Sequence, residues 1–214
     1  MEIWLLIFGL AIGAVLFIGG KLRENKESFV PTLAPVTDEE ENKHDITAPN
    51  EQDWWNGLPL SETQQLALAL AKKTMPIWQS YTQETIISYK DSTNGAHKNI
   101  DPRFLQSSLA ILTVHASDVS TLDVDPEIRN CYNEFVEPIV ALQDGLWTPP
   151  FPVKKIFFSM YYILKSMVER TDEASQREYL SISIAHAFDS LDMTRLYNSK
   201  EINAFIDSYK VLGK

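Results

Sequence analysis

The chain has 214 residues, 44% of them hydrophobic, and a formal net charge of −10 at pH 7. Apart from an anchor and a linker, this length leaves room for one globular domain with its own core. A domain this acidic is repelled by phosphate backbones, so we expect no nucleic-acid binding. Cys131 is the only cysteine, which excludes an intramolecular disulfide. Scarce glycine and little strand-like alternation favour an all-α fold.

Residues 3–20 form an apolar segment without a charged side chain. As a helix this segment spans about 27 Å, close to the bilayer core of about 30 Å. The alternative is a secretory signal peptide, which needs a basic stretch before the apolar run and a small-residue cleavage site after it. The sequence has neither. We therefore expect an uncleaved transmembrane helix, within an anchor region of residues 1–27, that contacts the membrane.

The basic residues that flank the apolar segment all follow it. They are Lys21, Arg23 and Lys26, and nothing basic precedes the segment. The positive-inside rule then places the C-terminal side in the cytoplasm. The sequence predicts a single-pass protein of the cell (inner) membrane, with its N-terminus outside and its C-terminal domain cytoplasmic.

Gly9 and Gly13 form a G-x-x-x-G pattern within the apolar segment. Glycines four residues apart leave a groove in which a second helix can approach closely. The pattern is therefore compatible with a homodimer through the transmembrane helix. Glycine is also common in such helices without any dimerisation, so this alternative stays open.

A linker is predicted over residues 28–53. Pro31, Pro35 and Pro49 oppose regular structure there, and residues 38–41 are a run of four acidic side chains. A flexible linker of this length has a root-mean-square span of roughly 30 Å. We expect it to hold the domain of residues 54–214 away from the bilayer.

Trp54 and Trp55 lie where the linker meets the domain. Adjacent residues on a helix point in different directions, so at least one of the two rings is a candidate for exposure. One interpretation is that they cap the core, and the other is that they contact a partner.

The domain is predicted to be a bundle of about six helices joined by short loops. Asp101-Pro102 and Asp125-Pro126 are helix-start signals, an N-cap residue followed by proline. Gly145 is a stop signal. The predicted helices cover residues 61–89, a segment starting at 101, 125–145, 153–170, 171 or 172 to 191, and 199–213.

The segment 153–170 is apolar on nearly all sides, which predicts the buried centre of the bundle. Lys154, Lys155 and Lys165 interrupt it, so it is not a second membrane span. The prolines of residues 147–152 predict an extended corner before it.

A pattern of histidine and aspartate occurs twice, as His115-Ala-Ser-Asp118 and His186-Ala-Phe-Asp189. Residues three apart share a helix face, so each pair can point at one ion. Two pairs from facing helices would supply two imidazoles and two carboxylates, a ligand set for Zn, Fe or Mn. The alternative is that each aspartate only forms a hydrogen bond with its histidine near a helix end.

Nucleotide-binding, zincin, nucleophile-elbow and C-x-x-C motifs are missing from the sequence. We therefore expect a non-enzymatic protein, a membrane-tethered helical adaptor or scaffold module that binds a protein partner at the cytoplasmic face. One alternative is a metal-dependent enzyme that uses the two H-A-x-D pairs, with a divalent metal as its only cofactor. Another is an accessory subunit of a membrane complex.

Overall fold

The computed structural model describes residues 54–115, 124–169, 172–194, 196–197 and 199–210. They belong to one of the two units into which the chain divides, Leu33–Lys214. The other unit, Met1–Thr32, lies outside the described residues, as do the predicted transmembrane helix and linker. Among the helices that are described, none has both the length and the apolar character needed to span a membrane.

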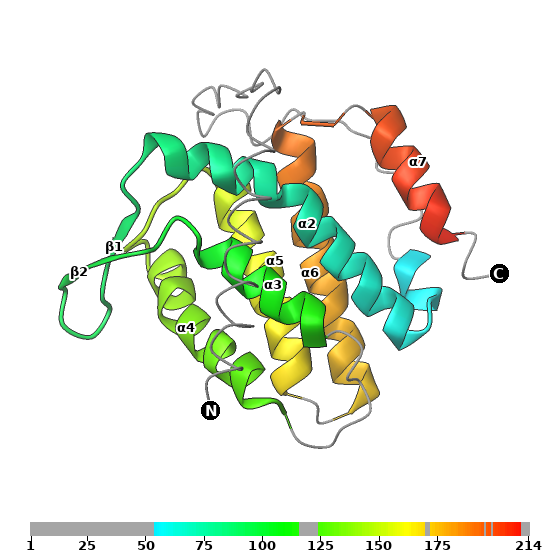
Figure 1. The fold of residues 1–214 in the computed structure, drawn as a ribbon, viewed down its shortest axis with the longest axis horizontal. Helices are drawn as coiled ribbons and strands as arrows, with labels where there is room; N and C mark the ends of the chain where they lie inside the picture. The colour runs from blue at the N-terminus through cyan, green and yellow to red at the C-terminus, as the bar shows by residue number, and fades with distance from the viewer. Residues whose placement is uncertain (1–53, 116–123, 170–171, 195, 198, 211–214) are drawn as a thin grey trace, which may run out of the picture. The chain divides into compact units, whose positions relative to one another are not determined.

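The described part of the chain is all-helical apart from one short hairpin, which confirms the predicted fold class for these residues (Figure 1). It contains six α-helices, a 3-10 turn and two antiparallel strands. In chain order the elements are η2 (Trp54–Gly57), α2 (Leu60–Glu84), β1 (Ser88–Lys90), β2 (His97–Asn99), α3 (Phe104–His115), α4 (Pro126–Gln143), α5 (Phe151–Val168), α6 (Glu173–Thr194) and α7 (Ser199–Lys210).

Helix α5 is the centre of the bundle, as its apolar sequence predicts. It packs against α2, α3, α4 and α6, and its most extensive contact is with α6. Small polar residues lie in the α5–α6 contact: the hydroxyls of Ser159 and Ser183 are 3.1 Å apart and both residues are fully buried. Ser190 donates to the carbonyl of Pro152 at 3.0 Å. These hydroxyls satisfy one another or the backbone, so burying them carries little penalty.

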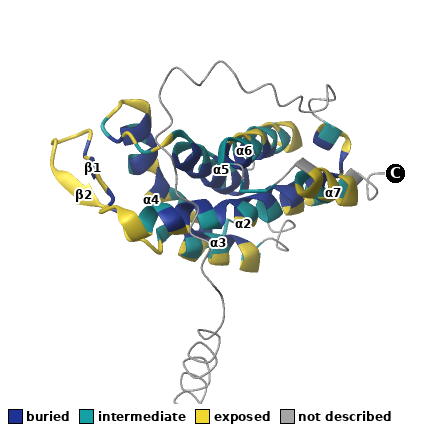
Figure 2. Ribbon diagram, turned by 90° about the horizontal axis from the view of Figure 1, so that it is seen from above, coloured by how far each residue is buried: buried dark blue, intermediate teal, exposed yellow. Residues whose placement is uncertain are grey.

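Aromatic rings meet around Phe157 on the inner side of α5. Its ring lies 4.7 Å from Trp147, 5.4 Å from Trp78, 5.7 Å from Phe135 and 6.0 Å from Phe104. Phe157, Trp78 and Phe135 are all fully buried. Helices α2, α3 and α4 and the corner before α5 therefore contribute rings to one aromatic core. Buried residues line the sides of these helices that face α5 (Figure 2).

The start signal Asp125-Pro126 and the stop signal Gly145 act as predicted, whereas the helix predicted from Asp101-Pro102 begins only at Phe104. Asp125 caps α4 by accepting the backbone N–H of Glu127 at 2.7 Å, with Pro126 at the first helical position. Asp172 accepts the N–H of Ser175 at 2.7 Å before α6. Gly145 ends α4 with a φ of 69°, a conformation that glycine adopts without strain.

The prediction that the first domain helix runs to residue 89 is wrong. Helix α2 ends at Glu84, and the chain continues into strand β1. Ile87 and Tyr89 are buried while residues 86 and 88 are exposed, a period of two that fits a strand and not a helix. Gly95, with a φ of 69°, lies in the turn of the hairpin.

The predicted extended corner before α5 is two residues too long. Helix α5 begins at Phe151, and Pro152 lies inside its first turn. Proline is tolerated there because the first N–H groups of a helix have no partner within the helix. The corner therefore covers only Trp147–Pro150.

Candidate functional site

The outward side of α5 carries a continuous row of aromatic and basic side chains, which we call the α5 stripe. Its members follow helical spacing and are all partly exposed. They are Phe151, Lys154, Lys155, Phe158, Tyr161, Tyr162 and Lys165. Helix α5 contains three lysines and no acidic residue, in a chain whose net charge is −10.

At the N-terminal end of the α5 stripe, Lys155 contacts two residues of α6. Its ammonium donates to Asp189 Oδ2 at 2.8 Å and lies 3.4 Å from His186 Nδ1. Burial and then the charge of Lys155 lower the pKa of His186 from 6.5 to about 4, so the imidazole is neutral at pH 7. The rings of Phe158 and Tyr162 lie 5.4 Å and 6.0 Å from this imidazole.

At the C-terminal end, Glu169 is surrounded by hydroxyl donors. Tyr132 donates to Glu169 Oε1 at 3.2 Å and Tyr179 donates to Oε2 at 3.0 Å. The hydroxyls of Tyr132 and Tyr161 are 3.3 Å apart. Lys165 lies 3.7 Å from Glu169 and 4.7 Å from the centre of the Tyr179 ring. Burial raises the pKa of Tyr132, so its hydroxyl stays protonated.

The chemistry that the α5 stripe offers is binding. Ring faces, ammonium groups and phenol hydroxyls suit a partner with apolar and acidic groups. The thiol of Cys131, the one cysteine, is buried, and burial raises its pKa, so it is not an activated nucleophile. The feature of the sequence that could have predicted the α5 stripe is the absence of acidic residues from 151–168. The apolar pattern of the same segment indicated a buried helix instead.

The first histidine of the repeated pattern, His115, meets two carboxylates at the start of α4. Its Nε2 lies 3.1 Å from Glu127 Oε2 and its Nδ1 lies 3.6 Å from Asp125 Oδ2. One ligand atom from each of the three residues lies within 4.8 Å of the others, a spacing that can hold a metal ion. Asp118, the predicted partner of His115, lies outside the described residues.

The second pair has different neighbours. His186 and Asp189 both contact the ammonium of Lys155. Helix α6, which carries this pair, packs mainly on α5 and α2, whereas α3 packs on α2, α4 and α5. The four-ligand metal site of His115, Asp118, His186 and Asp189 stays a prediction, because Asp118 is not described.

The two tryptophans at the start of the domain have different environments. Trp55 is buried and donates its indole N–H to Ser181 Oγ at 2.9 Å, and its ring lies 5.9 Å from the tilted ring of Phe188. Trp54 is partly exposed and meets the Trp55 ring edge-on. Trp55 therefore contributes to the core, and a partner contact at Trp54 stays a prediction. Gly9 and Gly13 lie outside the described residues.

Comparison with protein-family models, with curated proteins and with solved structures finds no match for this chain.

Proposed function

We propose that the protein is a membrane-tethered helical interaction module, an adaptor or scaffold that binds a protein partner at the cytoplasmic face of the cell membrane. The observation that supports this proposal is the α5 stripe, a partly exposed row of four aromatic side chains and three lysines. The partner contacts it through apolar and acidic groups. The anchor of residues 3–20 and the linker of residues 28–53 keep the domain near the membrane.

The placement of Lys154 supports a binding role. Lys154 and Lys155 lie near the N-terminus of α5, where the partial positive charge of the helix dipole disfavours cations. Lys155 offsets this cost through its ion pair with Asp189 of α6, whereas the position of Lys154 opposes helix stability. Local rules are broken in this way mostly at functional sites.

The linker explains how a modest affinity of the domain for its partner would be enough for binding at the membrane. A linked domain meets a membrane-associated partner at an effective concentration that the linker length sets, without new contacts. The same arrangement would serve an accessory subunit of a membrane complex, which differs only in how permanent the partner is.

A pair of charge-reversal variants tests the role of the α5 stripe. Lys154→Glu changes a stripe residue, and Lys72→Glu makes the same change in net charge on an exposed part of α2. The full chain is purified in mild detergent and the co-purifying proteins are quantified by mass spectrometry. We expect a near-stoichiometric partner with the wild type and Lys72→Glu, and its loss with Lys154→Glu. Equal recovery with both variants, or no partner with the wild type, contradicts the proposal.

The second candidate function, a metal-dependent enzyme, is favoured by the grouping of His115, Asp125 and Glu127. A histidine with two carboxylates is a ligand set for a divalent ion. Glu127 is exposed, and Asp125 already uses Oδ1 to cap α4. The cluster also serves to join α3 to α4, so it gives weaker support than the α5 stripe.

A further inference from the structure

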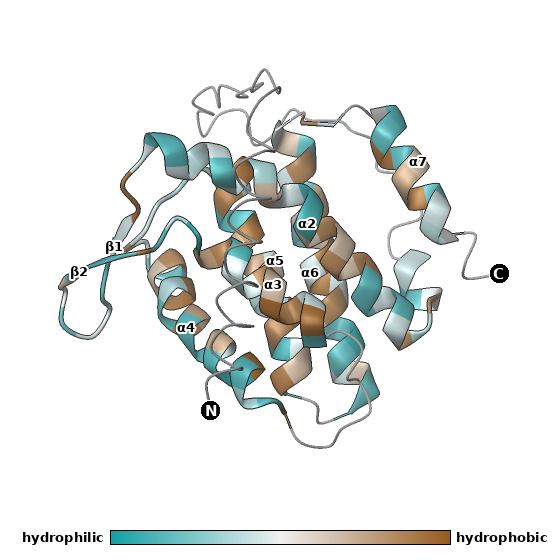
Figure 3. Ribbon diagram, in the orientation of Figure 1, coloured by the Kyte–Doolittle hydropathy of each residue, from teal (hydrophilic) through white to brown (hydrophobic). Residues whose placement is uncertain are grey.

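An open groove of about 600 Å³ lies at the base of the β-hairpin, where α2 ends. One wall consists of residues 82–87, which are the end of α2 and the segment before β1, and the other wall consists of residues 99–102. Residues 86 and 87 are both isoleucines, and they make the segment between α2 and β1 hydrophobic (Figure 3). The groove therefore brings together the C-terminus of a helix and an apolar segment.

Both walls of the groove are fixed to the body of the domain. The N–H of Ile100 donates to the carbonyl of Ile87 at 3.0 Å, which joins one wall to the other. The indole N–H of Trp78, a fully buried residue of α2, donates to the carbonyl of Pro102 at 2.7 Å. A partner would therefore meet a groove whose shape is already formed, which reduces the cost of binding.

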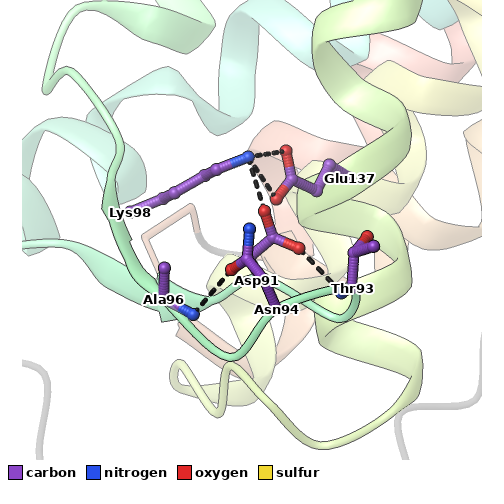
Figure 4. A network of polar contacts seen from close by, with 6 residues as sticks. All are labelled: Asp91, Thr93, Asn94, Ala96, Lys98 and Glu137. Atoms are coloured by element: carbon purple, nitrogen blue, oxygen red, sulfur yellow. Dashed lines mark hydrogen bonds and ion pairs between the residues drawn. The ribbon is translucent and has the colours of Figure 1, made fainter.

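The hairpin beside the groove is held on α4. Lys98 of β2 bonds to Asp91 Oδ2 at 2.8 Å and to Glu137 Oε2 of α4 at 2.7 Å (Figure 4). The ring of Tyr89 lies 6.4 Å from the ring of Trp147. Lys98 is thus already paired with carboxylates of its own chain, and it does not neutralise the groove.

The groove is acidic. Its lining includes two carboxylates, Glu84 and Asp101, and no lysine, arginine or histidine. The carboxylate of Asp101 forms an ion pair with Arg103 at 3.2 Å, so Arg103 offsets its charge. Glu84 is exposed, and no hydrogen bond or ion pair within the described residues involves its carboxylate. Glu84 therefore sets the charge of the groove.

The position of Glu84 opposes the stability of α2. Glu84 is the last residue of the helix, and the last turn has no basic side chain. The carbonyls of residues 82–84 have no backbone N–H partner within the described residues, so they carry the partial negative charge of a helix C-terminus. A cation is favoured at this end of a helix, whereas α2 has an anion there. The carbonyls and the carboxylate together favour a positively charged group in the groove.

An exposed apolar side chain adjoins this negative charge. Ile86 is 87% exposed, the largest exposure among the large apolar residues of the described chain. Ile87 and Ile100 also line the groove, and both are buried. Ile86 is therefore the apolar contact that the groove offers to a partner.

We propose that the groove binds a segment of a protein partner that carries a basic side chain beside an apolar one. The ammonium or guanidinium group contacts the Glu84 carboxylate and the carbonyls of residues 82–84, and the apolar side chain covers Ile86. A second copy of this chain is a less suitable occupant. Since its net charge is −10, it brings the same excess of acidic groups to an acidic surface.

The inference goes beyond the proposed function, because none of the residues that line the groove belongs to the α5 stripe. The bait is the full chain in mild detergent, and the probe is a displayed library of short random peptides. Peptides that bind empty detergent micelles are discarded. The affinity of the selected peptides is then measured for the wild type and for the variants.

A matched pair of charge reversals tests the role of Glu84. Glu84→Lys places a cation at the C-terminus of α2, where the helix dipole favours it, so this variant should keep or raise Tm. Glu178→Lys makes the same change in net charge at an exposed position of α6. The neighbouring Arg177 bonds to the Leu58 carbonyl before the other end of α2, about 37 Å from Glu84 along the helix.

We expect the selected peptides to carry arginine or lysine next to an apolar residue and to bind the wild type and Glu178→Lys equally. Binding to Glu84→Lys should be weaker by about tenfold or more, and Ile86→Ser should weaken it by about fivefold. A loss of binding in Glu84→Lys without a loss of Tm cannot come from unfolding. Lys154→Glu should leave peptide binding intact, which separates this result from a failure of the α5 stripe.

Several outcomes would overturn the inference. They are that no peptide is selected, that the selected peptides lack a basic residue, or that these peptides bind Glu84→Lys as tightly as the wild type. Equal weakening in Glu178→Lys would show attraction to the whole acidic domain and not to the groove. Binding of a second copy of the chain alone, at the groove, would also contradict it.

Discussion

Two adjacent phenylalanines of α5 should differ sharply when each is replaced by alanine. Phe157 is fully buried and contacts four aromatic rings, whereas Phe158 belongs to the partly exposed α5 stripe. Phe157→Ala removes a fully buried side chain and leaves a cavity, for which the cost is about 3–5 kcal/mol. Phe158→Ala removes a side chain that water already reaches, so we expect the free energy of unfolding to fall by about 1 kcal/mol or less.

The two losses in the free energy of unfolding correspond to decreases in Tm that can be told apart. For a domain of this size, each kcal/mol lowers Tm by about 2–4 °C, so Phe157→Ala should lose roughly 6–20 °C and Phe158→Ala only a few degrees. Near-ultraviolet circular dichroism of the full chain in mild detergent follows unfolding through its tryptophans. Equal shifts for the two variants would refute the assignment of an inner and an outer side to α5. Phe158→Ala should nonetheless lose the partner that co-purifies with the wild type.

The remaining predictions concern the anchor, His186, Trp55 and metal content. Deletion of residues 1–20 should release a folded domain into the aqueous phase, and aggregation of that fragment would contradict the tethered-module proposal. The pKa of His186 is lower in the folded state, so the unfolded chain binds more protons between pH 6.5 and about 4. Stability should fall as pH falls through that window, and His186→Gln should flatten the urea midpoint against pH. Trp55→Phe loses the hydrogen bond to Ser181 and should cost about 1 kcal/mol, measured by urea unfolding. Metal analysis of the purified chain should find no stoichiometric ion, whereas an ion that is lost in His115→Ala would favour the enzyme alternative.

Local signals in the sequence were sufficient for most of the helical framework. Asp125-Pro126 and Gly145 act within one helical turn of their own positions, so their effect does not depend on the rest of the fold. The central position of α5 in the bundle was predictable from its apolar composition, because a helix that is apolar on nearly all sides is normally buried.

The hairpin was not predicted because its stabilising contacts are distant in sequence. Ile86 and Ile87 follow a strong helical pattern, and only the pairing with residues 96–100 and the packing on Trp147 make the extended form favourable. Pairing between strands is decided by register and by tertiary burial, which a propensity for one segment does not include.

The candidate sites show the same division between local and distant information. The sequence by itself determined that His186 and Asp189 share a helix face, since three-residue spacing does so on any helix. Only the tertiary structure decided that Lys155 lies between them, that His115 meets Asp125 and Glu127, and which side of α5 faces outward. Those outcomes depend on how helices pack against one another, and residues far apart along the chain set that packing.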